Sequence, residues 1–406
     1  MIKVSKQNFE CLIDLGTNKS VCVICKKKEN NNLKIIGWSH KKSIGIHKGK
    51  IIDTDVLSKN IINLIEEASN KISFKNLLIT LNVSDPNIVL KEFISNINMG
   101  GLNISKKDIR NLYKKNLNVQ VSNQKKLIHS VPTKFKVDDK FYFNNPLGVV
   151  CNKLELTSKN IFINLSLFNH FQSCIKDHRY TINELVDTSF SSSISALNEI
   201  EKNHGVSCID IGAGLTKIIT FHKNNIIDIC YLLIGGNDVT NDISKGLEIS
   251  TELAEYIKIV HGNLLFSQDK KINLNLINGK EKIIKQNLLH GIIKPRYEEI
   301  FELIYNRLQK IISNSIQIQK IVLTGGASQM SGIVEFTTKM LNRQSRLSSP
   351  LNELNYFSNK PEFSTIIGMI ELQKHSAFKN INHFSKNNFF QNTFERFDNW
   401  IKEGLT

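Results

Sequence analysis

Two segments of the chain share one pattern of apolar and polar positions: an apolar run ends in an aspartate, a short turn follows, and a second apolar run returns. These are residues 11–24 and residues 206–220. Because short apolar runs bounded by glycine are typical of buried strands, each segment predicts a β-hairpin. A third apolar run, Ile321–Leu323, ends at Gly325–Gly326 and leads into a predicted helix over 332–341.

The second hairpin carries two glycines, Gly212 and Gly214, where a hairpin turn needs only one. Such a pair leaves consecutive backbone N–H groups uncovered, which is typical of an anion-binding turn. Asp210, at the end of the preceding strand, can hold a cation against that anion. An ordinary glycine hairpin is the alternative interpretation. The recurrence of the pattern at Asp14 favours two similar domains that close on one nucleotide.

Between the two hairpins, the pattern predicts an α/β domain that is interrupted by an α+β insert. The α/β part is expected to contain strands over 33–38 and 77–81 and an amphipathic helix over 54–71. The insert is expected to contain a helix that begins at Ser105 and short strands over 88–90, 93–94, 126–130, 135–137, 154–156 and 161–163. Two further helices are expected over 167–175 and 188–202.

After the second hairpin, a strand is expected over 226–234, and a helix-rich segment extends to about residue 319. Within it, Glu255 and Lys258 are three residues apart and therefore share one helix face. One interpretation is a surface salt bridge, and the other is a pair that hydrogen-bonds the ribose or adenine of a nucleotide. The two candidate phosphate turns favour the second interpretation.

The last residues have an amphipathic pattern of their own. Residues 374–388 are rich in Lys, Asn and Ser, which predicts a linker. Beyond them, apolar side chains recur at helical spacing: Phe390, Phe394, Phe397 and Ile401, with Trp400 at the edge of the same face. A helix docked on the body of the protein is one interpretation, and an interfacial membrane anchor is the other. The polar linker favours the anchor, in which apolar insertion carries most of the binding.

Composition narrows the class of protein. The 406 residues are 41% hydrophobic and 22% charged, which is typical of a globular protein with room for two domains. No run approaches the roughly 20 apolar residues of a membrane span, and the first six residues are too polar for a signal peptide. The seven cysteines lack metal-ligand spacing and fit reduced thiols in a cytoplasm, with Cys22 and Cys25 expected to pack inside a strand.

The net charge of +16 raises the question of a nucleic-acid partner. The lysines are scattered, however, and no Arg-rich stripe or aromatic stacking platform is present in the sequence. We therefore expect no nucleic-acid partner. A general attraction to anionic lipid surfaces stays open.

Together these features resemble the actin/Hsp70/sugar-kinase ATPase superfamily. The Asp14 turn is similar to its first phosphate motif, the Asp210 turn to its second, and Gly325–Ala327 to its adenosine motif. Within it, the chain most resembles the FtsA family of bacterial cell-division proteins, actin homologues that tether the tubulin homologue FtsZ to the inner membrane. The resemblance covers nearly the whole chain and includes five further segments in matching order: residues 43–49, 127–132, 145–148, 257–262 and 295–297.

The resemblance implies an α/β fold: an actin-like two-domain ATPase core with an inserted α+β subdomain and a C-terminal amphipathic helix. It implies ATP and Mg²⁺ as cofactors, with Mg²⁺ held by Asp14 and Asp210 through water. The residues expected to bind nucleotide are Asp14, Gly16, Thr17, Asn18, Lys19, Asp210, Gly212, Ala213, Gly214, Leu215, Thr216, Glu255, Lys258, Gly325, Gly326 and Ala327.

The resemblance also implies a map of domains and partners. The first domain would comprise 1–83, 163–203 and 346–373, and the second 204–241 and 303–345. The insert, 84–162, would mediate self-association in a filament and contact later divisome membrane proteins. The helical segment 242–302 would bind the C-terminal peptide of FtsZ, with Arg296 and Glu299 as contacts. A linker, 374–388, would lead to a membrane-targeting helix, 389–406, at the cytoplasmic face of the inner membrane at the septum.

Two departures from the superfamily pattern bear on activity. Leu215 stands where relatives usually offer a hydroxyl, with Thr216 one step later, and Lys217 stands where relatives often carry an acid. No water-activating residue is identifiable, so we expect a weak ATPase at most. A small-molecule kinase of the same superfamily is the alternative, but it needs a catalytic carboxylate for which the sequence has no candidate. An Hsp70-like chaperone would need a β-rich domain, and the residues after Ile370 are too few for one.

Overall fold

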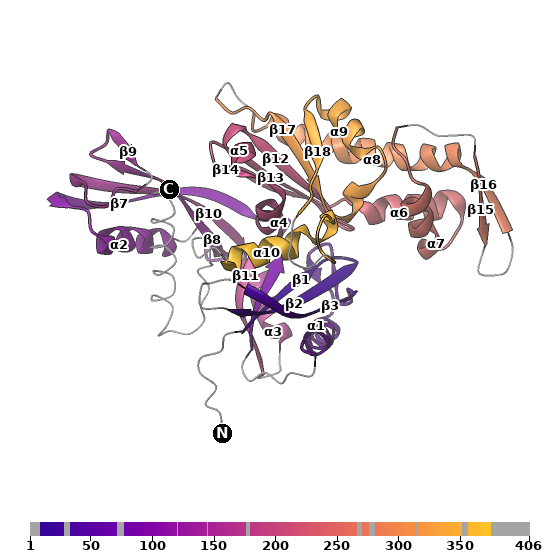
Figure 1. Ribbon diagram of the computed structural model, residues 1–406, viewed down its shortest axis with the longest axis horizontal. Coiled ribbons are helices and arrows are strands. Elements are labelled where there is room, and N and C mark those ends of the chain that lie inside the picture. Colours follow the sequence, from indigo (N-terminus) through magenta and orange to yellow (C-terminus); the bar gives the residue numbers. More distant parts are fainter. Residues whose placement is uncertain are drawn as a thin grey trace. The chain divides into compact units, whose positions relative to one another are not determined.

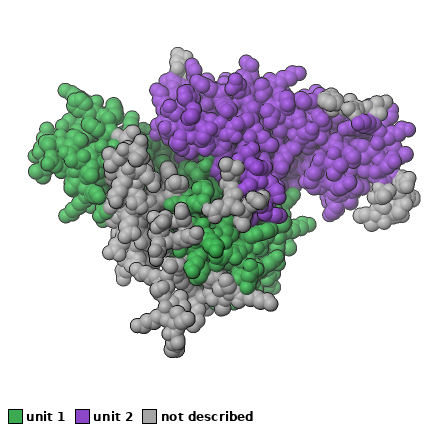
Figure 2. Space-filling model, in the orientation of Figure 1, with its two compact units in different colours: residues 1–194, 365–406 green, residues 195–364 purple. Residues whose placement is uncertain are grey.

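The structure, a computed structural model, describes residues 9–27, 33–70, 77–119, 121–143, 145–175, 179–265, 270–275, 281–312, 315–350 and 356–374. The chain divides into two compact units (Figure 2). Unit 1 contains residues 1–194 and 365–406, and unit 2 contains residues 195–364. Each unit is built around one five-stranded sheet.

The sheet of unit 1 begins with the first predicted hairpin. Strands β1 (Phe9–Leu15), β2 (Lys19–Lys27) and β3 (Leu33–Lys42) form an antiparallel meander, and β6 (Leu77–Val83) and β11 (Tyr180–Asp187) add in parallel on the other side of β1. Helix α1 (Thr54–Ala68) packs on β2 and β3 and against α3 (Leu165–Cys174). The short strands β4 (Ile46–His47) and β5 (Lys50–Ile51) form a separate pair. The sequence did not predict β11.

The sheet of unit 2 repeats this topology. Strands β12 (Val206–Ile211), β13 (Thr216–His222) and β14 (Asn225–Leu232) form the antiparallel meander, and β17 (Lys320–Thr324) and β18 (Gln344–Leu347) add in parallel beside β12. The orders β3-β2-β1-β6-β11 and β14-β13-β12-β17-β18 therefore correspond strand by strand. Both predicted hairpins are confirmed, and each opens the sheet of its own unit.

The predicted α+β insert is confirmed within unit 1, between β6 and α3. It is a four-stranded antiparallel sheet in the order β7-β10-β8-β9, covered on one face by α2 (Lys106–Leu117), as Figure 1 shows. Ser105 caps α2 through a capping box with Asp108. The strands are β7 (Val89–Asn103), β8 (Lys125–Val137), β9 (Phe141–Phe143) and β10 (Val150–Asn164).

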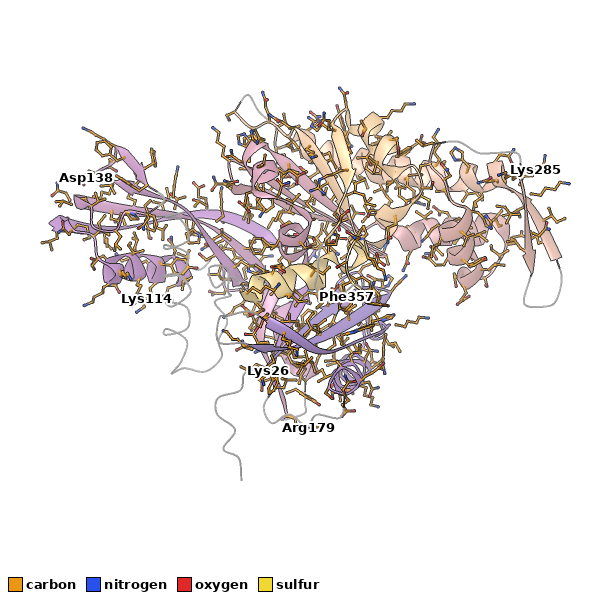
Figure 3. The ribbon with its side chains drawn as sticks, viewed as in Figure 1. Lys26, Lys114, Asp138, Arg179, Lys285 and Phe357 are labelled. Atoms are coloured by element: carbon orange, nitrogen blue, oxygen red, sulfur yellow. The ribbon has the colours of Figure 1, made fainter. Side chains whose placement is uncertain are left out.

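The short strands predicted for the insert are pieces of longer ones. β7, β8 and β10 each join two predicted segments, and register shifts between Thr157 and Ser158 and between Ile161 and Phe162 interrupt the pairing of β10 with β8. Such bulges break the alternation of apolar residues without ending a strand, which explains the shorter predictions. Asp138, labelled in Figure 3, closes the turn after β8 by accepting the N–H groups of Asn152 and Lys153, each at 2.8 Å.

After its antiparallel meander, unit 2 carries α6 (Gly236–Leu247), α7 (Thr251–His261) and α8 (Gln286–Gln309) between β14 and β17, and α9 (Ile333–Leu341) after β17. A hairpin of β15 (Lys271–Asn275) and β16 (Glu281–Lys285) lies within the segment that was expected to be helix-rich. The sequence signal for this hairpin is an alternation of apolar and polar residues. Ile272 and Leu274 are buried, whereas Lys271 and Asn273 are exposed.

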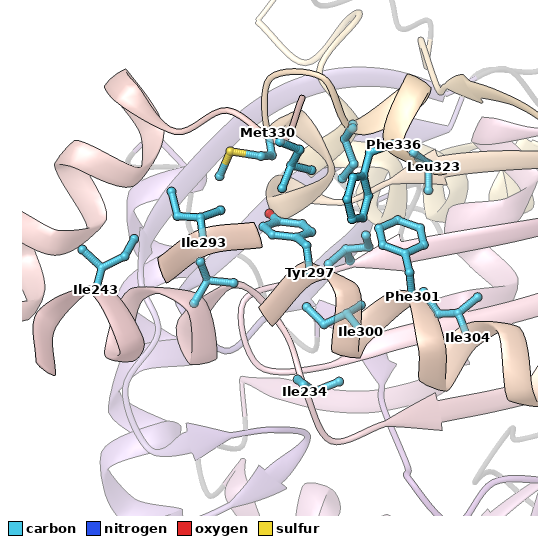
Figure 4. Close-up of a cluster of buried hydrophobic side chains, with 14 of the residues drawn as sticks. Ile234, Ile243, Ile293, Tyr297, Ile300, Phe301, Ile304, Leu323, Met330 and Phe336 are labelled. Atoms are coloured by element: carbon cyan, nitrogen blue, oxygen red, sulfur yellow. The ribbon is translucent and has the colours of Figure 1, made fainter. Parts of the chain in front are cut away.

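The core of unit 2 joins α8 and α9 to the sheet (Figure 4). Tyr297 and Phe301 of α8 are fully buried, and the ring of Phe301 meets that of Phe336 of α9 edge-on, with centroids 5.6 Å apart. Edge-to-face pairs of this kind add to the apolar area that the rings bury. Helix α8 is therefore held firmly next to the turn that follows β17.

The helix predicted over 188–202 is two helices. Helix α4 (Thr188–Ala196) ends before Asn198, and α5 (Glu199–His204) begins after it. Asn198 accepts the N–H of Glu201 while the Glu201 carboxylate accepts the N–H of Asn198. This capping box starts a new helix and overrides the continuous apolar pattern.

The remaining elements are the 3₁₀ turns η1 (Gly326–Gln329) and η2 (Pro361–Phe363) and helix α10 (Ser364–Lys374). Helix α10 includes Lys374, the first residue of the predicted linker. The rest of that linker and the predicted tail helix lie outside the described residues. Cys22 and Cys25 are fully buried free thiols on β2, as predicted.

Candidate nucleotide site

The turns of the two hairpins have the same backbone geometry. In the first, the N–H of Gly16 donates to the carbonyl of Lys19 at 2.9 Å, and in the second, the N–H of Gly212 donates to the carbonyl of Leu215 at the same distance. Asp14 and Asp210 hold equivalent positions, each one residue before the end of its strand. The sequence repeat is therefore a structural repeat.

In unit 1, the first turn is anchored by Asn82 of β6. Its amide donates to the Asp14 carboxylate and its carbonyl oxygen accepts the N–H of Leu15, both at 2.6 Å. Asp14 is buried, whereas Thr17 and Lys19 are partly exposed and Asn18 is exposed. Sequence reasoning missed Asn82, although a polar residue at the end of a buried apolar run was the available signal.

In unit 2, the second turn leaves backbone donors available. Among the described residues, the N–H groups of Ala213 and Gly214 make no hydrogen bond to the chain. Leu215 is buried, and the fully buried hydroxyl of Thr216 donates to the carbonyl of Ile234 at 2.9 Å. The second turn can therefore bind an anion through its backbone, and it offers no hydroxyl for that purpose.

The third turn lies tightly against the second hairpin. Gly325 has φ +87°, and a Cβ on it would overlap the Asp210 carboxylate and lie 2.6 Å from the carbonyl oxygen of Ile211. Ala327, two residues after Gly325, is held in place by α8, because the hydroxyl of Tyr297 donates to its carbonyl at 2.8 Å. Gly326, in contrast, is exposed.

Glu255 and Lys258 do not form a surface salt bridge. The Lys258 side chain is only 7% exposed, and its ammonium donates to the Glu255 carboxylate at 2.6 Å, the Thr240 hydroxyl at 2.8 Å and the carbonyl of Gly236 at 3.1 Å. Burial lowers the pKa of Lys258, and the nearby Glu255 carboxylate opposes that shift. A Cβ on Gly236 would lie 3.0 Å from the Cβ of Ala327, so this lysine and the third turn are neighbours.

A turn that the sequence did not assign joins these groups. The N–H of Gly236 donates to the carbonyl of Gly212 at 2.9 Å, and the N–H of Asn237 donates to that of Ala213 at 2.7 Å. One connected set of groups within unit 2 therefore contains the second turn, the start of α6, Lys258 and the third turn. The predicted residues of the first turn belong to unit 1.

The residues at Asp210 do not favour direct coordination of a magnesium ion. The ammonium of Lys217 donates to the Asp210 carboxylate at 2.9 Å, and both side chains are buried. A Mg²⁺ bound directly to that carboxylate would lie within about 5 Å of the ammonium, given Mg–O distances of about 2.1 Å. Charges of +2 and +1 at that distance repel by roughly 7 kcal/mol at an effective dielectric constant of about 20.

Asp14 has the chemistry of a Mg²⁺ ligand, since Mg²⁺ in proteins is bound through one or two carboxylates together with phosphates and waters. Among the described residues, no three His, Cys, Asp or Glu side chains are grouped as a protein-only metal site. Any Mg²⁺ at Asp14 would therefore need ligands from the nucleotide or from water.

Arg296 and Glu299, the expected contacts for FtsZ, lie on α8. The guanidinium donates to both carboxylate oxygens of Asp242, at 2.6 and 3.1 Å, and it also pairs with Glu299. These interactions raise the pKa of Arg296 above its ordinary value, and the hydrogen bond to Asp242 contributes most. Its charge is thus already compensated within unit 2.

The residues expected to contact a membrane, Phe390, Phe394, Phe397, Trp400 and Ile401, lie outside the described residues. Within the described part, no helix is both long and apolar enough to cross a membrane.

Comparisons with known proteins point to one family. A family model described as "Cell division protein FtsA" matches residues 207–368, and one described as "SHS2 domain inserted in FTSA" matches residues 87–162. The cell division protein FtsA of Buchnera aphidicola subsp. Schizaphis graminum is 27% identical in a match that covers 96% of this chain and 97% of that protein.

Solved structures show the same fold at low identity. A chain of the PilM–PilN type IV pilus biogenesis complex has a TM-score of 0.60 at 13% identity, covering 91% of this chain and 99% of that one. MreB5 of Spiroplasma citri bound to AMPPNP has a TM-score of 0.56 at 12% identity, covering 91% and 97%. The fold is therefore that of the actin-like ATPases, as the sequence predicted.

Proposed function

Because the chain belongs to the FtsA family of cell-division proteins, we propose that it binds ATP and tethers FtsZ filaments to the cytoplasmic face of the inner membrane at the division septum. One observation carries the nucleotide part of this proposal: the connected set of groups in unit 2. The N–H groups of Ala213 and Gly214 would bind phosphate, and Lys258, Glu255 and the turn at Ala327 would bind the nucleoside.

The first turn of unit 1 would add phosphate contacts through Gly16, Thr17, Asn18 and Lys19, and Asp14 would accept the Mg²⁺ that accompanies ATP. The sequence offers no identifiable water-activating residue for either turn. We therefore propose a nucleotide-binding protein whose ATPase activity is weak or absent, in which bound ATP favours self-association.

Binding of FtsZ is proposed for the segment 242–302. Helix α7 exposes Tyr256 and Ile259, whose accessible fractions are 57% and 70%, and these give a short peptide an apolar surface. Arg296 would then exchange its internal ion pairs for contacts with the acidic residues of the peptide, and Glu299 would contact the peptide beside it. The cost of that exchange makes a weak, reversible interaction the expected outcome.

Self-association and recruitment of later divisome proteins are proposed for the insert, residues 84–162. Its strands expose Ile94, Leu102 and Phe141, each at least 60% accessible. Exposed apolar residues on strands of an open sheet favour pairing with another chain.

The membrane contact is proposed for the tail, on its sequence pattern. The test is co-sedimentation of the full chain, and of a chain that ends at Asn388, with anionic liposomes, FtsZ and ATP. We expect FtsZ to pellet with liposomes only when the full chain is present. Phe397→Glu should abolish this, whereas Asn399→Glu adds the same charge on the opposite side of the predicted helix and should preserve it.

If the shortened chain pellets FtsZ with liposomes as well as the full chain does, the tail is not the anchor. If FtsZ binds neither chain in solution or on liposomes, the tether function fails as a whole. Nucleotide binding is measured separately, so its failure would not be confused with either result.

A further inference from the structure

The second phosphate turn contains its own cation. We propose that Lys217 takes the place of the divalent metal at Asp210, so that nucleotide binds to this turn with little dependence on Mg²⁺. The inference rests on the proposed nucleotide binding and concerns the charge that accompanies the phosphates.

The position of Lys217 is set by strand register. Asp210 of β12 and Lys217 of β13 are direct cross-strand partners, so their side chains leave the sheet on the same face. The ammonium lies 2.9 Å from a carboxylate oxygen of Asp210, and the two side chains are 12% and 6% exposed. The pair is built into the hairpin and is not a surface contact that solvent would loosen.

The ion pair also lies next to the anion-binding backbone. A Cβ on Gly212 would be 3.7 Å from the Lys217 ammonium, and the Asp210 carboxylate abuts Gly325 of the third turn. An anion bound by the N–H groups of Ala213 and Gly214 would therefore have a fixed positive charge nearby. A lysine ammonium has three N–H donors and can serve the carboxylate and a phosphate oxygen together.

The first hairpin shows that this arrangement is not general to the motif. There the cross-strand partner of Asp14 is Val21, which is buried and apolar, and Asp14 is held by the neutral amide of Asn82. The cross-strand position that Lys217 occupies beside Asp210 is thus apolar beside Asp14, and the ammonium of Lys217 compensates the Asp210 carboxylate within the hairpin. A polyphosphate near Asp210 thus meets no net negative charge for a metal to offset.

The experiment is equilibrium binding of ATP to the full chain, in excess Mg²⁺ and in EDTA. We expect the dissociation constant of the unmodified protein to rise by no more than about threefold in EDTA, because the second turn keeps its cation and only the contact at Asp14 loses its metal. For Lys217→Gln we expect a rise of about tenfold or more, since only Mg²⁺ can then offset Asp210. Lys217→Arg should restore the shallow dependence.

Lys223→Gln is the matched control, because it removes one positive charge from the exposed far end of the same strand pair and should leave the Mg²⁺ dependence unchanged. Thermal unfolding without nucleotide shows whether Lys217→Gln is folded. The comparison for the unmodified protein does not depend on that variant.

A rise of tenfold or more in EDTA for the unmodified protein would overturn the inference while leaving nucleotide binding intact. Equal dependence in Lys217→Gln and the unmodified protein would also overturn it. If the unmodified protein binds no ATP in either condition, the proposed nucleotide site fails, and this inference fails with it.

Discussion

Gly325 and Gly326 are adjacent glycines of one motif, yet the structure predicts opposite outcomes for their replacement by alanine. Gly325 has φ +87°, and a Cβ there would lie 2.6 Å from the carbonyl oxygen of Ile211 and 2.8 Å from its carbonyl carbon. These are backbone atoms of a central strand and cannot rotate away. At Gly326, the nearest atom would be the Cβ of Glu362 at 3.7 Å, which is an ordinary contact.

The magnitude for Gly325→Ala follows from two terms. A backbone at φ +87° and ψ 162° is essentially confined to glycine and costs an alanine about 1–3 kcal/mol, and displacing packed neighbours costs about 1–3 kcal/mol. The free energy of unfolding should therefore fall by roughly 2–6 kcal/mol. For a unit of the size of residues 195–364, this corresponds to a fall in the melting temperature of roughly 4–24 °C.

The assay is thermal unfolding followed by circular dichroism, without nucleotide. Gly326→Ala should melt close to the unmodified protein. Gly291→Ala is a second control: it lies exposed in α8 with nothing within 4 Å of its Cβ, and should stabilise by about 0.5–1 kcal/mol because alanine favours helix. If Gly325→Ala and Gly326→Ala melt within about 2 °C of each other, the tight packing of the third turn on β12 is refuted.

Two further predictions concern buried charge. Burial lowers the pKa of His129 to about 3, and its ring accepts the N–H of Asp187 at 2.9 Å. In the unfolded chain the pKa of this histidine is about 6.5. Its contribution to the free energy of unfolding should therefore fall by about 2 kcal/mol from pH 7 to pH 5. Urea unfolding at both pH values measures this change. The free energy of unfolding of His129→Gln should fall less between pH 7 and pH 5 than that of the unmodified protein, and an equal fall would contradict the lowered pKa of His129. Burial would raise the pKa of Glu201, but hydrogen bonds from Arg346 and Lys320 lower it to about 2. Arg346→Met should therefore cost about 1.5–3 kcal/mol at pH 7, because Lys320 still pairs with the Glu201 carboxylate. Adding Glu201→Gln should recover part of this cost, and no recovery would contradict the pairing.

The sequence was informative where local pattern and tertiary structure agree. The two hairpins, the third turn and the insert were predicted because buried strands that end at glycine leave a strong local signal. The departures at Leu215 and Lys217 were also visible in the sequence. The sequence did not show that Lys217 contacts Asp210, because the strand register across the turn decides which side chains meet.

Other features needed the fold. Asn82 reaches Asp14 across sixty-eight positions of sequence, because β6 pairs with β1 in parallel after a helical crossover. The spacing of Glu255 and Lys258 left a surface salt bridge as one of two interpretations, because nothing in the local sequence shows that α6 covers the lysine. The capping box at Asn198 was local, but the apolar run around it outweighed the signal.

The insert enters through β7 and leaves through β10, and these strands are paired along their length, with Val89 opposite Phe162. Its two ends are therefore neighbours, as the ends of a hairpin are. A segment held by adjacent ends can be exchanged between relatives, or closed over with a short loop, without moving the sheet from which it emerges. The architecture therefore lets the insert diverge while the five-stranded sheet of unit 1 stays as it is.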